Sequence, residues 1–378
     1  MRIGVPRETS PGERRVALVP ESGKKLIQAG YQVVVEAGAG SAAGFPDAAY
    51  REAGVTVDPA SATVLGADLV LKVNRPEQNE VAAMRPGSIY LGSLMPLRNL
   101  ETVRTLAARG ITAFSTDAIP RTTRAQSMDT LSSMANIAGY KGALLAAAEL
   151  NKYFPMLMTA AGMVPPARVF VVGAAVAGLQ AIATARRLGA NVFATDVRPE
   201  VKEQIESVGA KYVGIELKEA ASAGGGYAKE LTEEDRARQR ELLAAQCAQS
   251  DVVITTALIG GVFAPRLISA DMVKAMRPGA VIVDLAADGG GNCELSRPGE
   301  TVAVDGVTIV APLNLPATMP LHASLLFSRN LTAFLLAFTK DRTFQLDFTD
   351  DIQQGAAITH DGEVKHARTR DALQKAGT

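Results

Sequence analysis

A run of small residues between two apolar stretches is the part of the sequence that most clearly predicts a ligand. The turn GAAVAG, from Gly173 to Gly178, follows the β-branched run Val169–Val172. We expect Gly173 to allow a tight turn and Gly178 to allow close packing of the following helix on the strand. The free N–H groups and positive dipole at the start of that helix would attract a pyrophosphate.

A carboxylate lies where a dinucleotide-binding unit uses one. Asp196 follows the strand-like run Asn191–Thr195, at about the spacing of 20 residues from the turn. A carboxylate there accepts hydrogen bonds from an adenosine ribose and repels a 2′-phosphate, so NAD(H) is favoured over NADP(H). Ala175 replaces the usual middle glycine, and its methyl group would displace the phosphates slightly outward. The alternative is a Rossmann-like domain that packs in this way and binds nothing.

A second concentration of polar side chains lies in residues 120–140, PRTTRAQSMDTLSSMANIAGY. On a helix, Gln126, Asp129 and Ser133 would share one face because of their spacing. The segment joins two predicted domains, and ligand sites favour such junctions. A solvated helix start capped by Ser127 or Asp129 explains the same residues equally well. The residues alone leave both interpretations open.

Two loops carry weaker signals. Residues 7–15 concentrate Arg and Glu, which is typical of a solvated loop but also of a carboxylate site, because guanidinium groups pair with carboxylates. Three glycines, 224–226, precede Tyr227 and predict a mobile flap with one amphipathic side chain at its tip. A disordered surface loop is the more common meaning of such a stretch.

Alternating strand-like and helix-like segments surround these stretches. Strands are predicted at Arg2–Val5, Gln32–Val35, Leu69–Val73, Ile89–Leu91, Thr112–Phe114, Lys211–Ile215, Asp251–Ala257, Ala280–Leu285 and Val307–Val310. Helices are predicted at Glu21–Ala29, Leu100–Arg109, Gly142–Leu150, Leu179–Leu188, Lys202–Val208, Leu267–Met276 and Leu321–Phe338. Such alternation predicts parallel sheets that are covered on both faces.

We therefore predict an α/β protein of two doubly wound Rossmann-like domains with a cleft between them. The N-terminal domain spans residues 1–132, and the dinucleotide-binding Rossmann domain spans 133–324. The helix Leu321–Phe338 returns the chain to the first domain, which residues from about 325 to 378 complete. A turn at Asp361-Gly362 predicts that the chain ends as a small hairpin or edge strand. The breaks at 286–292 and 312–316 fall at the carboxyl edge of the second sheet, which faces the ligand in such folds.

Composition excludes several classes of protein. Lys+Arg and Asp+Glu balance at 39 each, so charge gives no reason to expect nucleic acid. Cys247 and Cys293 lie far apart, which argues against a disulfide scaffold or a zinc site and fits a reducing cytoplasm. The N-terminus lacks the apolar core of a signal peptide, and the uncharged run Val169–Ala185 is too short to span a membrane. We expect a soluble protein that reaches a membrane only through a partner.

Several motifs together resemble a known family. RAQSMDTLSSMANIAGY, GAAVAGLQAIATA, ATDVR, GGYAKE, ITTALI and VIVDLA…GGNCELS are similar to the NAD(H)-binding alpha component, domain I, of proton-translocating NAD(P) transhydrogenase. The resemblance runs from the first strand to about Asp341. It implies a homodimer at the cytoplasmic face of the cell membrane, which passes a hydride from NADH to NADP⁺ on an NADP(H)-binding subunit. A membrane-spanning subunit couples this transfer to proton movement, and a chain ending at 378 resembles the version split into separate polypeptides.

The resemblance also implies roles for individual residues. The positions that hold the nicotinamide and its ribose or phosphates are matched by Arg121, Gln126, Asp129 and Ser132, and the first three form the implied catalytic set. Tyr227 matches the tip of a mobile loop that closes on bound nucleotide. The cofactor-binding residues implied in the second domain are Gly173, Ala175, Val176, Gly178, Asp196, Val197, Arg198, Tyr227 and Asn314.

Alanine dehydrogenase is the alternative family member. PRETSPGERRVALVP and LVLKV are similar to that enzyme, whose substrate arginine and lysine would be Arg15 and Lys72. Its catalytic histidine is missing from IYLGSLMPL, since the three histidines, 322, 360 and 366, lie near the C-terminus. Oxidising an amino acid requires proton transfers, whereas hydride passage between two nicotinamides requires alignment and exclusion of water. The missing histidine therefore favours transhydrogenation.

Overall fold

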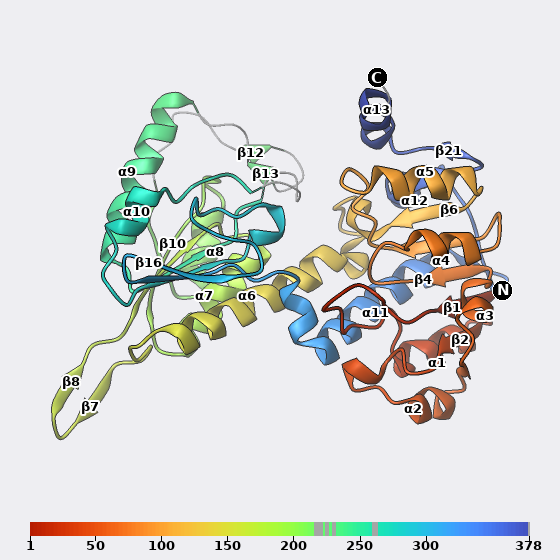
Figure 1. Ribbon diagram of the computed structural model, residues 1–378, viewed down its shortest axis with the longest axis horizontal. Helices are drawn as coiled ribbons and strands as arrows, with labels where there is room; N and C mark the ends of the chain where they lie inside the picture. The colour runs from red at the N-terminus through yellow and green to blue at the C-terminus, as the bar shows by residue number, and fades with distance from the viewer. Residues whose placement is uncertain (215–221, 224–226, 229–231, 259–263, 377–378) are drawn as a thin grey trace. The chain divides into compact units, whose positions relative to one another are not determined.

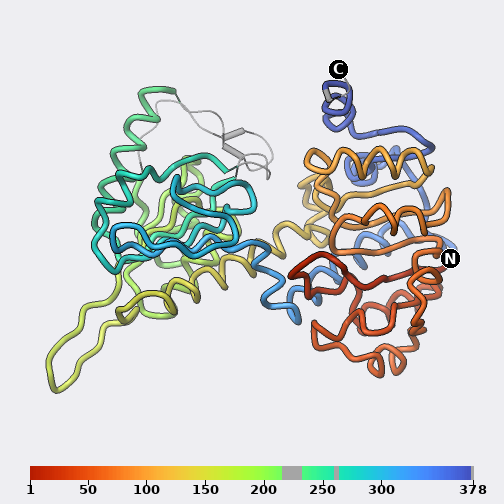
Figure 2. Tube along the Cα trace, viewed as in Figure 1, coloured from red at the N-terminus to blue at the C-terminus, as the bar shows by residue number. Residues whose placement is uncertain are grey.

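The computed structural model describes residues 1–214, 222–223, 227–228, 232–258 and 264–376 (Figures 1 and 2). The chain forms two compact units. Met1–Met134 and Ala317–Thr378 make the first unit, and Ala135–Pro316 make the second. Helix α6 (Thr130–Glu149) begins in the first unit and ends in the second.

The first unit contains an eight-stranded sheet in the order β21-β20-β6-β5-β4-β1-β2-β3. Strands β1 to β6 are mutually parallel, and their order 3-2-1-4-5-6 is that of a doubly wound fold. The strands are β1 (Arg2–Val5), β2 (Gln32–Glu36), β3 (Thr56–Asp58), β4 (Leu69–Leu71), β5 (Ile89–Gly92), β6 (Thr112–Ser115), β20 (Ala357–His360) and β21 (Glu363–Val364). The helices are α1 (Pro20–Gln28), α2 (Asp47–Glu52), α3 (Ser61–Leu65), α4 (Gln78–Ala83), α5 (Leu100–Ala108), α11 (Pro320–Ala337), α12 (Asp351–Ala356) and α13 (Ala367–Ala376).

The C-terminal part of the chain completes this first unit. Figure 2 shows its blue segment running among the red and orange N-terminal elements. Phe327, Leu331 and Phe334 of α11 belong to the same apolar core as β1 and β4, which is why the chain returns. The predicted C-terminal hairpin is present as β20 and β21, with β20 antiparallel to β6. The prediction that the chain ends there is wrong, because the polar, helix-favouring residues of α13 follow.

The second unit contains a seven-stranded sheet in the order β11-β10-β9-β14-β15-β17-β16. It repeats the doubly wound order, and only the edge strand β16 is antiparallel. Its strands are β9 (Arg168–Val172), β10 (Asn191–Thr195), β11 (Lys211–Tyr212), β14 (Val252–Thr255), β15 (Val281–Asp284), β16 (Thr301–Val304) and β17 (Val307–Val310). Its helices are α7 (Val176–Arg187), α8 (Val201–Ser207), α9 (Glu233–Gln249) and α10 (Ala270–Lys274). None of the helices in the described parts of either unit combines the length and apolar character needed to cross a membrane.

Small antiparallel hairpins were not predicted from the sequence. They pair β7 (Leu157–Thr159) with β8 (Gly162–Val164), and β12 (Ser222–Ala223) with β13 (Tyr227–Ala228). A third pairs β18 (Thr339–Lys340) with β19 (Thr343–Phe344). Each strand has only two or three residues, so its apolar pattern is too short to be distinguished from a loop.

Both sheets bury both of their faces. In β9, Val169 and Val171 belong to one apolar core, whereas Phe170 and Val172 belong to another. In β4, Leu69 and Leu71 pack on one side of the first sheet, and the intervening valine packs on the other. Successive side chains of a strand point to opposite faces, so a sheet covered on both faces requires continuous apolar runs. The predicted α/β fold of two doubly wound domains is confirmed at this level.

The glycine turn between β9 and α7 has the geometry that its sequence predicts. Gly173 has φ +91°, a backbone conformation that side-chain-bearing residues rarely adopt. A Cβ atom added at Gly178 would lie 1.9 Å from the carbonyl oxygen of Gly173, so only glycine lets α7 approach the strand. Helix α7 begins at Val176, three residues before the predicted start.

We expect Gly178→Ala to destabilise the second unit by about 3 kcal/mol or more, because the added methyl group collides with backbone rather than with a side chain that can move. Urea unfolding measured by circular dichroism checks this. Ala175→Gly is the matched control, since Ala175 lies in the same turn with φ −77° and an exposed side chain. A loss of stability in the control equal to that of Gly178→Ala would contradict the proposed contact.

Candidate functional site

A cavity of about 480 Å³ in the first unit brings together four of the predicted site residues. Arg121, Gln126, Asp129 and Ser132 all line it, so one arginine, one amide, one carboxylate and one hydroxyl face the same space. The remaining lining residues are Ile119, Pro120, Thr122, Thr123 and Ala125. This set of donors and acceptors suits a polar ligand with amide and hydroxyl groups.

The start of α6 shapes this cavity. The carboxylate of Asp129 accepts a hydrogen bond from the backbone N–H of Ser132 at 2.8 Å and another from the Ser132 hydroxyl at 2.6 Å. Asp129 therefore caps the helix, which begins at Thr130. Gln126 lies before the cap in the 3-10 turn Gln126–Met128, so the predicted continuous helical face with Asp129 and Ser133 is wrong. The sequence left helix capping and ligand binding as alternatives for this segment. In the structure Asp129 both caps the helix and lines the cavity.

The segment that carries Gln126 is anchored on both sides. Ala125 and Met128 are buried in the core of the first unit. The side-chain amide of Asn330, on α11, donates a hydrogen bond to the carbonyl of Ser127 at 2.8 Å. Arg124 forms ion pairs with Asp350 and Asp351 at the start of α12. These contacts anchor the backbone between Arg121 and Asp129, which lines the cavity.

The second group of predicted residues lies at the carboxyl edge of the second sheet. The sheet changes its direction of winding between β9 and β14, the position at which open α/β sheets bind ligands. There the Thr256 hydroxyl donates a hydrogen bond to the Gly173 carbonyl at 3.0 Å. Ala175 and Val176 are exposed at the start of α7. The φ of Ala175 suits any residue, so the missing middle glycine introduces no backbone strain.

Asp196 is tied to the glycine turn. Its Oδ2 atom accepts a hydrogen bond from the backbone N–H of Ala174 at 2.8 Å, which joins the end of β10 to the loop after β9. Arg198 also contacts this carboxylate, with its Nε atom 2.9 Å from Oδ1 and its Nη2 atom 2.9 Å from Oδ2. Both side chains are largely buried, and Val197 between them is partly buried. The carboxylate thus stands where the sequence places it, beside an arginine whose pairing the sequence did not reveal.

Two loops complete the same edge, and the structure adds a residue that the sequence analysis missed. Asn292 is fully buried, accepts a hydrogen bond from the N–H of Ala257, and donates to the carbonyls of Ala257 and Pro265. It therefore joins the loops that follow β14 and β15. Its position after three glycines was the available signal, although an asparagine beside glycines usually marks a simple turn.

The other predicted residues of the second unit occupy separate loops. Asn314 has φ +46°, and its backbone N–H donates to the carboxylate of Asp288 in the loop after β15. Tyr227 lies in β13, whose partner β12 pairs it with Ala223. The glycines at 224–226, on which the predicted flap depends, lie outside the described residues. The flap therefore stays a prediction.

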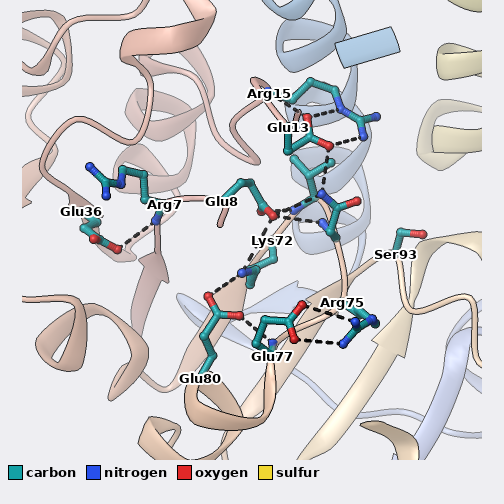
Figure 3. Close-up of polar contacts among 12 residues, drawn as sticks. Arg7, Glu8, Glu13, Arg15, Glu36, Lys72, Arg75, Glu77, Glu80 and Ser93 are labelled. Atoms are coloured by element: carbon teal, nitrogen blue, oxygen red, sulfur yellow. Dashed lines mark hydrogen bonds and ion pairs between the residues drawn. The ribbon is translucent and has the colours of Figure 1, made fainter. Parts of the chain in front are cut away.

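A buried cluster of charges lies at the carboxyl edge of the first sheet, after the neighbouring strands β1 and β4. The chain leaves these two strands toward opposite sides of the sheet. Figure 3 shows Lys72 between Glu8 and Glu80. Its Nζ atom is 2.6 Å from Glu80 and 3.8 Å from Glu8. Glu8 also accepts a hydrogen bond from the N–H of Val73 at 2.7 Å. Burial raises the pKa of Glu8 to about 7, although the ammonium of Lys72 acts in the opposite direction.

This buried cluster contains the two residues that would bind substrate in an alanine dehydrogenase. Arg15 makes a bidentate pair with Glu13, through Nε at 2.8 Å and Nη2 at 2.7 Å, and Lys72 is paired as described. His360 contacts Thr112 and Asp361, and His366 contacts Thr369. These contacts join His360 and His366 to residues outside the cluster. The cations of the cluster are each paired with a carboxylate.

Comparisons with known proteins agree with the two-unit architecture. The family described as "Alanine dehydrogenase/PNT, N-terminal domain" matches residues 4–138, and "Alanine dehydrogenase/PNT, C-terminal domain" matches residues 142–367. The chain is 47% identical to the first part of the NAD(P) transhydrogenase subunit alpha of Rhodospirillum rubrum, over 97% of this chain and 98% of the relative.

Solved structures give the same result. The transhydrogenase from Sinorhizobium meliloti is 44% identical with a TM-score of 0.88, covering 96% of this chain and all of that one. L-alanine dehydrogenase is 26% identical with a TM-score of 0.84, covering 99% of each chain. The fold is shared by both, and the identity is higher to the transhydrogenase.

We expect Glu8→Gln to change how stability depends on pH. The folded chain retains the Glu8 proton up to about pH 7, whereas the unfolded chain releases it near pH 4.5. Glu8 therefore favours folding below pH 4.5, and its contribution falls as pH rises to 7, by roughly 3 kcal/mol in total. Glutamine does not titrate, so the wild-type stability minus that of Glu8→Gln should fall over this interval.

Urea unfolding at several pH values between 5 and 8 measures this difference. Glu52→Gln is the control, because Glu52 is an exposed carboxylate on α2. A difference between wild type and Glu8→Gln that stays constant from pH 5 to pH 8 would show that Glu8 titrates normally.

Proposed function

Because the chain belongs to the alanine dehydrogenase/PNT family and is 47% identical to a transhydrogenase alpha subunit, we propose that it is the NAD(H)-binding component of a proton-translocating transhydrogenase. In this proposal a hydride passes from NADH on this chain to NADP⁺ on a partner subunit. The observation that carries the proposal is the cavity lined by Arg121, Gln126, Asp129 and Ser132.

These residues fit the nicotinamide end of the dinucleotide. A side-chain amide such as Gln126 can both donate to and accept from a carboxamide. The Asp129 carboxylate and the Ser132 hydroxyl, which already contact each other, suit ribose hydroxyls, and the guanidinium of Arg121 suits phosphate oxygens. Arg121, Gln126 and Asp129 are the proposed catalytic residues, because they would touch the reacting half of the dinucleotide.

The second unit fits the adenosine end. The N-terminus of the 12-residue helix α7 supplies N–H groups and a positive dipole for the pyrophosphate. Asp196 stands where a carboxylate accepts hydrogen bonds from the adenosine ribose. We propose that Gly173, Ala175, Val176 and Gly178 contact the phosphates, and that Val197, Arg198, Tyr227 and Asn314 complete the site.

The chemistry asked of this chain is positioning. Bound NADH supplies the hydride itself, so the protein needs to hold the ring, align it with the acceptor and exclude water. The relative's name, subunit alpha, implies further subunits. The proposal assigns proton movement to a membrane-spanning partner, which would hold this chain at the inner face of the cell membrane.

Alanine dehydrogenase is the second candidate function, favoured by the shared fold and by the presence of Arg15 and Lys72. Against it, the segment IYLGSLMPL contains no histidine where that enzyme has its catalytic one. Mixing the purified chain with NAD⁺ and alanine distinguishes the two functions. Sustained NADH production without any partner protein would favour the dehydrogenase.

We further propose a homodimer that uses the β7–β8 hairpin. Figure 1 shows this hairpin extending away from the sheet of the second unit. Met158 and Met163 on the hairpin are 73% and 64% exposed, and Met156, just before β7, is 51% exposed. Exposed apolar side chains on a short two-stranded hairpin are unfavourable in water, and methionine packs well against irregular partner surfaces. A second copy of the chain is the proposed cover.

Gln126→Asn should lower the rate of hydride transfer about 10-fold or more, because the shorter side chain withdraws its amide from the cavity. The measurement mixes the variant with a purified NADP(H)-binding subunit and follows exchange with a nicotinamide analogue by absorbance. Gln78→Asn, an exposed glutamine on α4, is the control and should leave the rate unchanged. A normal rate in Gln126→Asn would show that the cavity is not the nicotinamide site.

Replacing Met158 and Met163 together by Glu should convert the dimer into a monomer, because two charges would be buried without partners. Sedimentation velocity measures the change. Leu346→Glu places a charge on another exposed apolar residue, 42% exposed in the first unit, and should leave the dimer intact. Wild-type chain that sediments as a monomer, or a variant that remains dimeric, would contradict the hairpin contact.

A further inference from the structure

The end of β10 carries two opposite determinants of coenzyme choice. Asp196 is the residue type that marks an NAD site, and Arg198, two positions later, is the type that accommodates the 2′-phosphate of NADP. Resting on the proposed NAD(H) function, we propose that Asp196 holds Arg198 in a paired state, and that this pair excludes NADP(H) from the dinucleotide site. Arg198 is thus a specificity-determining residue whose phosphate-binding capacity is masked.

The hydrogen bonds to Asp196 occupy the Nε and Nη2 donors of Arg198. Oδ1 of Asp196 accepts hydrogen bonds from the Nε atom of Arg198 at 2.9 Å and from its backbone N–H at 3.0 Å. Oδ2 accepts from Nη2 of Arg198 at 2.9 Å and from the N–H of Ala174 at 2.8 Å. The Nε–Nη2 edge is the same pair of donors that a guanidinium offers to a phosphate in a bidentate contact.

Burial strengthens this masking. The side chain of Arg198 is 14% exposed and that of Asp196 is 6% exposed, so water screens their attraction weakly. The hydrogen bonds to Asp196 raise the pKa of Arg198, so the guanidinium stays charged. A 2′-phosphate would have to break the bidentate pair and leave a partly buried carboxylate beside its own negative charge. An unphosphorylated ribose is neutral and meets no such repulsion.

The backbone holds both residues in place. The Ala174 hydrogen bond fixes Asp196 against the glycine turn, and the hydrogen bond from the Arg198 N–H closes a tight turn around Val197. These hydrogen bonds and the bidentate pair all end on the Asp196 carboxylate, which therefore holds the guanidinium at the adenosine end of the proposed site. Removing the carboxylate would release the Nε–Nη2 edge of the guanidinium, which could then contact a 2′-phosphate.

The consequence concerns an assembly in which NADH and NADP⁺ must occupy different subunits. A repulsive carboxylate alone would discriminate by charge, whereas the pair discriminates by charge and by removing the phosphate ligand. Repulsion alone and masking of Arg198 make different predictions for a chain in which both Asp196 and Arg198 are replaced. Only masking requires Arg198 for the gain in NADPH binding.

The test measures binding of NADH and NADPH to the purified full chain by titration calorimetry. We expect wild type to bind NADH and to bind NADPH far more weakly. Asp196→Ala should tighten NADPH binding by roughly ten- to a hundredfold, the effect expected of one released charge-assisted pair. Asp196→Ala combined with Arg198→Ala should lose that gain. If the alanine variant is unstable, Asp196→Asn takes its place in the test. The asparagine keeps an acceptor for the Ala174 amide and should show the same gain in NADPH affinity.

Glu203→Gln is the control for net charge, since it removes one negative charge from an exposed position on α8. It should leave both affinities unchanged. A double variant that gains NADPH affinity as strongly as Asp196→Ala would overturn the masking of Arg198 and leave repulsion alone. Absence of any gain in folded Asp196→Ala and Asp196→Asn would also overturn it. Failure of wild type to bind NADH would instead refute the proposed function.

Discussion

The burial of both faces of each parallel sheet is the constraint on which the rest of this structure depends. Strands such as β9 and β14 place successive apolar side chains in two separate cores, so their polar residues, Arg168 and Thr255, stand at the strand ends. Polar groups are therefore concentrated at the strand ends and in the loops that follow them. In a doubly wound sheet the crossovers diverge at one position, and both sheets place their polar clusters at that edge.

The two units use this edge differently. In the first, the side chains satisfy one another, since Glu13 pairs with Arg15 and Lys72 lies between Glu8 and Glu80. In the second, backbone groups dominate, because the glycine turn brings the start of α7 to the strand ends and Asp196 is fixed to the Ala174 amide. The first arrangement is a charge network inside a fold shared with alanine dehydrogenase. The second presents N–H groups and the Asp196 carboxylate, as the proposed dinucleotide site requires.

The proposed activity fits an active site that orients rather than protonates. The cavity beside α6 offers an amide, a carboxylate, a hydroxyl and a guanidinium on a backbone anchored by Asn330 and Arg124. Such a site can hold a nicotinamide ring in one orientation, and hydride transfer requires no proton donor. In the proposed coenzyme choice, too, the protein acts by positioning. Asp196 holds the guanidinium of Arg198, so that this guanidinium is not available to a 2′-phosphate.

The sequence by itself determined the fold class, the glycine turn and the residue types of both polar regions. The bounds of β1 and β10 were predicted without error because continuous apolar runs and the turns beside them are local features. Only the tertiary structure decided that Gln126 lies before the cap at Asp129, that Asn292 joins two loops, and that Asp196 is shared between Ala174 and Arg198. Each of these depends on which atoms meet across strands and loops, and the periodicity of a sequence carries no information on that pairing.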